Sequence, residues 1–208
     1  MPIGVPLVLA ATDPDAEPTW VDIYSRLYSE RLLFISQELT DSYTNQLISV
    51  LVFLHSEDLA KQLSCFINSP GGSVVCGISI YDCINFLNID LTTFCLGSAA
   101  SMASFVLTSG KFGKRFAYPN ARIMIHQPEG GSYGQSSELV VESNEVNRIR
   151  QQVVNIYAQR TGQSFTQISR DMDRDEFMSA EQAKDYGLID KVIAQDFDLM
   201  TQLGLSNR

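Results

Sequence analysis

Short runs of apolar residues alternate along the chain with longer segments in which apolar positions recur every three or four residues. The runs are typical of buried strands, and the periodic segments are typical of helices. We expect strands at 31–35, 63–67, 91–96, 115–118, 122–126 and 188–193. We expect helices at 20–30, 41–55, 74–87, 101–109, 136–161, 164–170 and 179–186. This alternation predicts an α/β fold with parallel strands joined by right-handed crossovers.

The two ends of the chain lack such a pattern. Residues 1–19 contain several prolines and no sustained period, which predicts a flexible N-terminal arm. Residues 194–208 predict a loosely attached C-terminal tail. We expect 20–193 to form one domain, because a chain of 208 residues with 45% hydrophobic content suits a single core.

Composition removes several classes of function. The net charge is −9, from 15 basic and 24 acidic residues, and no stretch concentrates Lys or Arg, which argues against nucleic acid as a partner. The four cysteines lie in apolar segments without a C-x-x-C pair, which favours core thiols in a reducing compartment over disulfides or a zinc site. No apolar run reaches the ~20 residues of a membrane span. The apolar run at 5–11 has no basic region before it, and Asp13, Asp15 and Glu17 argue against a transit peptide.

Small residues at 97–104 mark a candidate nucleophile. A strand that stops at Gly97 and becomes a small-residue helix can present one hydroxyl at its turn, beside free backbone N–H groups, and we assign that hydroxyl to Ser101. The same composition also fits a helix that packs closely against a sheet. His126 changes this balance, because it ends a second buried strand, so that two strand ends can bring a nucleophile and a base together. His55, at the end of a helix, fits a capping or dipole interaction.

Three further segments remain open on residues alone. The Pro-Gly-Gly turn at 70–72 fits a tight connection from strand to helix, or a turn whose N–H groups face a developing oxyanion. The acids at 171–176 are typical of a solvated helix end, and their number and spacing do not distinguish any one of them as a functional residue. The apolar stripe of the helix at 136–161 fits packing on its own core and contact with another subunit equally well; it consists of Leu139, Val146, Ile149, Val153 and Ile156.

Four motifs together resemble the proteolytic subunit family of Clp protease. They are INSPGG at 67–72, AASM at 99–102, IMIHQP at 123–128 and DRDEFMSA at 173–180, and they occur in the family's order and with matching separations. The resemblance covers about residues 20–193. The opening MPIGVP is similar to the version encoded in plastid genomes.

This resemblance implies a ClpP/crotonase-like fold of repeated ββα and βαβ units with a projecting long helix. It implies a serine endopeptidase in which Ser101 is the nucleophile, His126 the base and Asp175 the acid that orients the base. The backbone N–H groups of Gly72 and Met102 are the oxyanion donors that it implies. The family therefore selects Asp175 among the clustered acids, which spacing alone does not do.

The resemblance also implies an assembly. Members form two stacked rings of seven, with the long helix and the loop before it as the contact between rings, and the arm at 1–19 lines the axial entrance. A hexameric unfoldase docks there and uses ATP, whereas this chain has no nucleotide motif, and we expect no cofactor or metal in it. The implied substrates are unfolded proteins, and the implied location is the chloroplast stroma, with the cytoplasm of a bacterium as the alternative.

Two residues depart from the family's pattern, and two other functions are open to test. Ser98 stands where many members carry Gln or Leu, and Ala103 stands where Gly is usual, which places an additional methyl group beside the nucleophile turn. A structural ring subunit, similar to the inactive paralogues of mixed rings, is the first alternative, and the presence of all three catalytic positions counts against it. An acyl-CoA enzyme of the related crotonase fold is the second, and it would not need a Ser-His-Asp set.

Overall fold

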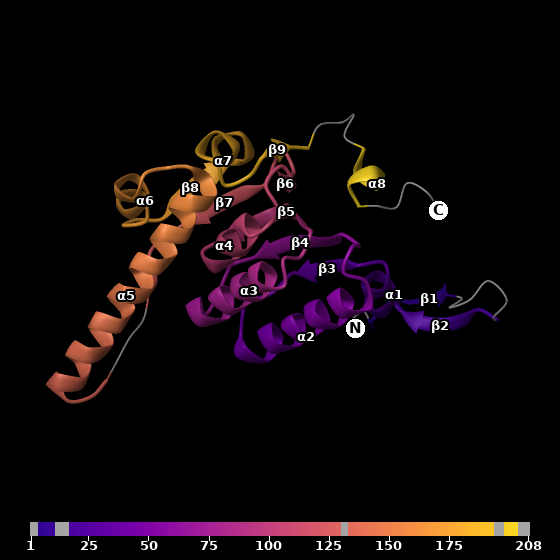
Figure 1. The fold of residues 1–208 in the computed structure, drawn as a ribbon, viewed down its shortest axis with the longest axis horizontal. Coiled ribbons are helices and arrows are strands. Elements are labelled where there is room, and N and C mark those ends of the chain that lie inside the picture. Colours follow the sequence, from indigo (N-terminus) through magenta and orange to yellow (C-terminus); the bar gives the residue numbers. More distant parts are fainter. Residues whose placement is uncertain (1–3, 11–16, 130–132, 194–197, 204–208) are drawn as a thin grey trace.

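A mainly parallel β-sheet of seven strands forms the centre of the fold (Figure 1). The computed structural model describes residues 4–10, 17–129, 133–193 and 198–203. The main path of the sheet is β3 (Leu32–Ile35), β4 (Leu63–Ser69), β5 (Leu91–Ala100), β6 (Arg115–Ala117) and β9 (Lys191–Val192). Strand β7 (Arg122–Ile125) pairs in parallel with the second half of β5, and β8 (Glu176–Ser179) pairs antiparallel with β7. The α/β class with parallel strands is confirmed.

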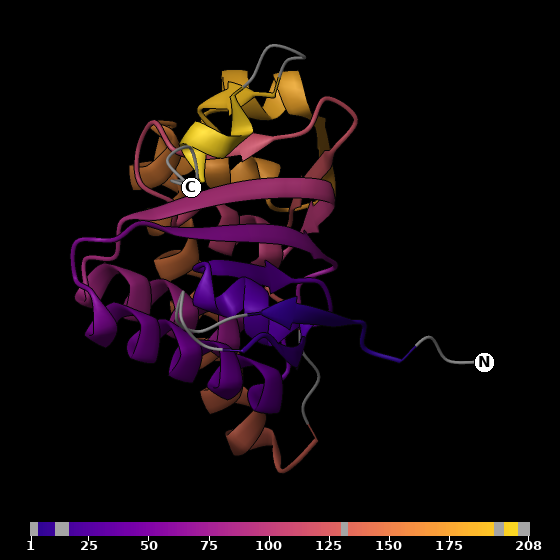
Figure 2. The same ribbon diagram turned by 90° about the vertical axis from the view of Figure 1, so that its right-hand side faces the viewer.

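Helices cover one face of this sheet. Helices α2 (Asp41–Glu57) and α3 (Val74–Phe86) lie side by side along it (Figures 1 and 2). Helix α4 (Met102–Thr108) is buried at every position. Because side chains alternate along a strand, Cys65 and Ile67 of β4 enter this main core while Phe66 between them faces the other way. The main core thus lies between the sheet and the helices that cover it.

The opposite face of the sheet carries an aromatic ladder. Phe34, Phe66, Phe94 and Phe116 are register partners on adjacent strands, and their rings stack with centroids 5.2, 4.8 and 5.3 Å apart. Leu27 of α1 (Ile23–Ser29) and Leu199 of α8 (Leu199–Gln202) pack against this second cluster. Offset aromatic stacking adds to the area that these rings bury.

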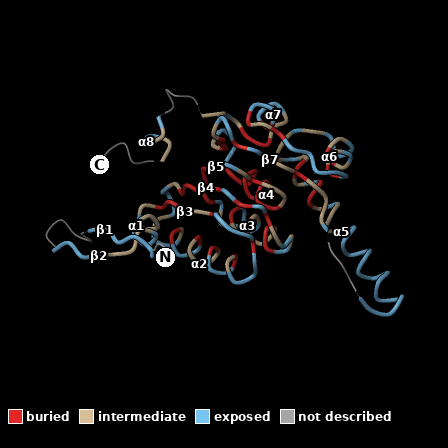
Figure 3. The backbone as a smooth tube through the Cα atoms, turned by 180° about the vertical axis from the view of Figure 1, so that it is seen from behind, coloured by how far each residue is buried: buried red, intermediate tan, exposed pale blue. Residues whose placement is uncertain are grey.

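Helix α5 (Ser136–Thr161) begins and ends at the predicted residues. Gln135 and Glu138 form a capping box at its start, and Gly162 ends it in the left-handed conformation. Its C-terminal half packs on the core through Val153, Val154 and Tyr157, whereas its N-terminal half extends away from the domain (Figure 1) and is exposed (Figure 3). The apolar stripe therefore packs on its own core in one half only.

Short helices follow α5 and support the last strands. They are α6 (Phe165–Asp171), capped by Ser164, and α7 (Ala180–Tyr186), which has a capping box of Ser179 and Gln182 and stops at Gly187. Both were predicted, but the last strand, β9, is only two residues long. No helix in the described part of the chain is long and apolar enough to cross a membrane.

Several predicted boundaries were wrong. Strand β5 does not stop at Gly97: that residue adopts φ 67° as a bend, and the strand continues to Ala100 because its second half gains β7 as a partner. Helix α4 consequently begins at Met102. The predicted helix at 20–30 is a strand, β2 (Thr19–Asp22), followed by α1, which Asp22 caps.

Besides β2, three elements were not predicted. They are β1 (Leu7–Ala10), which pairs antiparallel with β2, and β8 and α8. Parts of the expected arm, of the loop before α5 and of the expected tail lie outside the described residues, namely 1–3, 11–16, 130–132, 194–197 and 204–208.

Candidate active site

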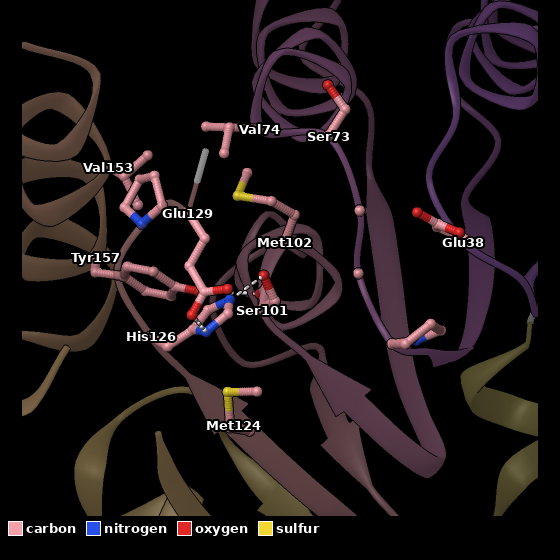
Figure 4. A pocket seen from close by; sticks show the side chains of 14 residues that line it. Glu38, Ser73, Val74, Ser101, Met102, Met124, His126, Glu129, Val153 and Tyr157 are labelled. Carbon is pink, nitrogen blue, oxygen red and sulfur yellow. Dashed lines mark hydrogen bonds and ion pairs between the residues drawn. The ribbon is translucent and has the colours of Figure 1, made fainter. Parts of the chain in front are cut away.

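The register of the sheet brings Ser101 and His126 together. Ala100, the last residue of β5, pairs with Met124 of β7, and the two parallel strands end at the same edge. Ser101 follows β5 directly and His126 follows β7 directly, so both side chains emerge at that edge. His126 Nε2 lies 2.7 Å from Ser101 Oγ (Figure 4). This distance is that of a hydrogen bond through which a histidine can take the serine proton.

Strand β8 brings Asp175 to the other nitrogen of the same imidazole. Ile125 pairs with Glu176 in the antiparallel ladder, so the residues just outside it, His126 and Asp175, face each other. His126 Nδ1 lies 3.3 Å from Asp175 Oδ1. A carboxylate at Nδ1 keeps the proton on that nitrogen and leaves Nε2 free to accept one. The structure thus brings all three predicted side chains into one line.

A second carboxylate lies near the same histidine and was not predicted. Glu129 Oε1 is 3.9 Å from His126 Nδ1, and its side chain is 80% exposed (Figure 4). Because Glu129 is both farther away and more exposed than Asp175, it holds the imidazole less firmly. Its place three residues after His126 is the only signal that the sequence contains for it.

Ser101 sits on a strained turn. Its backbone adopts φ 55° and ψ −127°, a conformation that costs a residue other than glycine about 1–3 kcal/mol. Such a turn between strand and helix lifts a serine hydroxyl clear of the sheet. Met102 is the first residue of α4, so its N–H has no partner within the helix, and the Ser101 side chain does not cap it.

The predicted glycine turn lies directly against the nucleophile turn. A Cβ atom built on Gly71 would be 2.6 Å from the Ala100 carbonyl oxygen and 2.8 Å from Ser101 Cβ. Gly71 donates its N–H to Ser69 Oγ, whereas no hydrogen bond among the described residues occupies the N–H of Gly72. The N–H of Gly72 is therefore available to a ligand at this edge, as is that of Met102.

These groups line a cavity of about 540 Å³ (Figure 4). Ser101, His126 and the glycine turn line it together with several apolar side chains. The apolar lining includes Val74, Met102, Met124, Val153 and Tyr157. A cleft with a few convergent polar groups and an apolar wall suits a substrate that combines a carbonyl with an apolar side chain.

The remaining singled-out residues lie outside this cavity. His55 is in the last turn of α2, and Ala103 is fully buried in the core, so its methyl group does not narrow the cavity. Ser98 donates its N–H to Asn68 Oδ1. Burial raises the pKa of the thiols of Cys65 and Cys95 to about 12, so neither competes with Ser101 as a nucleophile near neutral pH.

Two polar residues below the nucleophile were missed. Ser104 and Tyr157 are buried, and their hydroxyl groups lie 2.8 Å apart beneath Ser101. Tyr157 falls four residues after Val153 on the core-facing side of α5, and this spacing is the signal from which its burial could have been predicted.

The site is of the serine hydrolase class. It combines a serine and a histidine at two strand ends with an aspartate on the far side of the imidazole, and the glycine turn beside them leaves an N–H group free. The chain belongs to the Clp protease family, whose model matches residues 15–196. The family and the fold predicted from the four motifs are confirmed.

Similar proteins span almost the whole chain. A protein of Oltmannsiellopsis viridis is 58% identical over 92% of this chain and 98% of its own length. One from Chlorella vulgaris is 56% identical, with 92% and 96% covered, and one from Adiantum capillus-veneris is 49% identical, with 94% and 98% covered. Each is described as an ATP-dependent Clp protease proteolytic subunit.

Proposed function

We propose that this chain is a serine endopeptidase subunit that hydrolyses peptide bonds of unfolded proteins within an ATP-dependent Clp protease. The observation that carries the proposal is the line of Ser101 Oγ, His126 and Asp175, with 2.7 Å and 3.3 Å between successive groups. Family membership supports the same reaction class. A structural subunit would not need this line, and neither would an acyl-CoA enzyme.

The reaction follows from the roles that these positions permit. Ser101 Oγ attacks the peptide carbonyl while His126 Nε2 takes its proton, since a neutral hydroxyl is a poor nucleophile. Asp175 keeps the imidazole in the right tautomer and stabilises the imidazolium. The N–H groups of Gly72 and Met102 stabilise the tetrahedral oxyanion. His126 then protonates the leaving amine, and a water molecule activated by the same base hydrolyses the acyl-enzyme.

Membership in this family implies an oligomeric Clp complex with an ATPase partner. In the finer proposal the chain forms two stacked rings of seven, alone or mixed with inactive paralogues, and the exposed half of α5 with the loop before it joins the rings. The arm at 1–19 faces a hexameric unfoldase, and 20–193 form the peptidase domain. The unfoldase uses ATP, and this chain needs neither cofactor nor metal of its own.

The location that we propose is the plastid. The similar proteins come from algae and plants, which supports a plastid protein, and the finer assignment is to the stroma.

Fluorophosphonate labelling of the assembled protein, read by peptide mass spectrometry, tests the proposal. We expect an adduct on Ser101 and none in Ser101→Ala. Intact assemblies in which other subunits react and Ser101 does not would mean a structural subunit instead. Cleavage of an acyl-CoA thioester without labelling would favour the crotonase-type alternative.

A further inference from the structure

A buried polar cluster lies directly beneath the nucleophile turn. Ser104 Oγ is 2.7 Å from the Ser101 carbonyl oxygen, 2.8 Å from the Met124 carbonyl oxygen and 2.8 Å from the Tyr157 hydroxyl oxygen. The Tyr157 hydroxyl is itself 3.4 Å from the Ser101 carbonyl oxygen. Ser104 is 0% exposed and Tyr157 2% exposed, so this cluster is built into the core.

The cluster needs both of its hydroxyl protons. Ser104 has one proton, and two carbonyl oxygens compete for it at nearly equal distances. The Tyr157 hydroxyl supplies the second proton, either to Ser104 Oγ or to the Ser101 carbonyl. Burial raises the pKa of Tyr157 well above its ordinary value, so this hydroxyl keeps its proton at every pH at which a histidine base works. Without Tyr157, one buried acceptor loses a partner.

The two carbonyls that the cluster holds fix the backbone on both sides of Ser101. Met124 O accepts the N–H of Ser101 at 2.9 Å, and it also faces Ser104 Oγ. The Ser101 carbonyl belongs to the same planar peptide as the N–H of Met102. In a trans peptide these two groups point in opposite directions, so a carbonyl held toward the interior turns the Met102 N–H toward the cavity.

We propose that Ser104 and Tyr157 are positioning residues for the oxyanion donor of Met102 and for the hydroxyl of Ser101. They act through the backbone of the strained turn and touch no reacting atom. The inference rests on the proposed function, and it assigns a role in that reaction to a hydroxyl carried by α5. The Ser101 carbonyl also accepts the N–H groups of Ser104 and Phe105, at 3.0 and 3.3 Å, so the side chains refine an orientation that the helix already favours.

Tyr157→Phe is the sharpest test, because it removes one oxygen atom and leaves the ring in place. Phe105 packs edge-to-face on that ring with centroids 5.4 Å apart, a contact that a phenylalanine keeps. Loss of a whole oxyanion donor costs on the order of 10²–10³ in kcat, and a donor that is only tilted costs less, about tenfold. We expect kcat for a peptide substrate to fall about tenfold in the assembled protein, with KM nearly unchanged.

Tyr43→Phe is the matched control. Its hydroxyl likewise donates to a backbone carbonyl, that of Phe34 at 2.6 Å, and Tyr43 lines no part of the cavity. We expect kcat to stay at the wild-type value in this variant. Equal kcat values for Tyr157→Phe and wild type, in assemblies of the same size, would overturn the inference.

Two further readouts separate positioning from stability. The inhibition constant of a peptidyl aldehyde, whose bound form carries an oxyanion, should rise in Tyr157→Phe in step with the fall in kcat. Ser104→Ala should lower kcat in the same way, and the double variant should lose less than the product of the two effects, since both act on one peptide. A lower melting temperature with unchanged kcat and inhibition would mean a purely structural pair. If wild-type Ser101 itself fails to label, the proposed function is what has failed.

Discussion

Asp175 owes its proposed role to one contact. Its side chain is 59% exposed, the same fraction as that of Asp173, so exposure does not mark it as the functional acid, and only its contact with His126 Nδ1 does. We expect Asp175→Asn to lower kcat by about 10⁴ while the fold is retained, because an amide favours the wrong imidazole tautomer. Peptide hydrolysis by the assembled variant measures this, with circular dichroism to confirm folding.

Glu129→Gln is the control for that substitution. It removes a carboxylate that also lies near His126 Nδ1, at 3.9 Å, and we expect a change of less than about threefold, because exposed charges at this distance interact weakly. If the two variants lost activity equally, Asp175 would not be the orienting acid.

The backbone of Gly71 packs directly against the turn that carries the nucleophile Ser101. It has φ +95°, and a methyl group there would press on the Ala100 carbonyl and on Ser101 Cβ, both parts of the nucleophile turn. We expect Gly71→Ala to lower the rate of Ser101 labelling about 100-fold, since displacement of a reacting group by about 1 Å has that cost.

Gly113→Ala is the control that separates the effect of backbone strain at a positive φ from the effect of steric contact with the nucleophile turn. Gly113 also has positive φ, at +86°, but a Cβ atom there would meet nothing within 4 Å. We expect this variant to lose about 1–2 kcal/mol of stability from the left-handed backbone and to label at the wild-type rate. Normal labelling of Gly71→Ala would show that the glycine turn can move without disturbing Ser101.

At the scale of elements, one ion pair ties the end of the sheet together. Arg115 of β6 binds Asp190 through two guanidinium nitrogens, at 3.0 and 2.7 Å, and donates to the Arg160 carbonyl of α5 at 2.9 Å. Burial acts to raise the pKa of Asp190, but the hydrogen bonds and charge of Arg115 outweigh it, and the net shift is downward. A carboxylate with a lowered pKa stabilises the fold above its unfolded pKa, and this contribution is lost as the pH falls through the folded value.

Asp190→Asn should therefore destabilise the protein at pH 7, by about 1–3 kcal/mol because the pair is only partly buried and keeps some hydration, and by progressively less below about pH 4. Urea unfolding of both proteins at pH 7 and at pH 3 measures the two differences. Asp185→Asn, an exposed change on α7, should show no such pH dependence. A stability loss that is the same at both pH values would contradict the assignment to this charge.

Elements whose signals are local were predictable, and elements that depend on partners were not. Helix α5 carries its own capping box and its own glycine stop, so its bounds follow from neighbouring residues. Strand β5 passes through Gly97 only because β7 pairs beyond it, and β8 lies among clustered acids that resemble a helix end. The choice of Asp175 depends on the register of β8, which the residues alone do not contain. His126 was predictable because it directly follows a clear apolar run, and Ser101 because it lies in the small-residue segment that follows another.

At the scale of the whole molecule, the exposed half of α5 is the largest departure from a closed fold (Figures 1 and 3). Leu139 and Val146 are 39% and 42% exposed, although they continue the stripe that Val153 buries. An apolar stripe that extends beyond the core of its own domain and is exposed there is typical of an interface with another subunit. Gln151 offers a control on the same helix, since it is exposed, has the polar neighbours Asn147, Arg148 and Asn155, and lies roughly 130° around the helix from Leu139 and Val146 at ~100° per residue.

The double substitution Leu139→Glu with Val146→Glu tests the proposed contact between rings. Each new carboxylate would have to lose its hydration in an apolar interface, and that cost is repeated in every subunit, so we expect the assembly to separate into particles of half the mass or less. The chain should remain folded, because neither side chain supports the core of the domain. Sedimentation velocity measures the mass, with Gln151→Glu as a variant that adds like charge on the other side of the helix and should assemble normally. Intact double rings in the Leu139 and Val146 variant would exclude the stripe as the ring contact, and the helix would then extend into solvent for another reason.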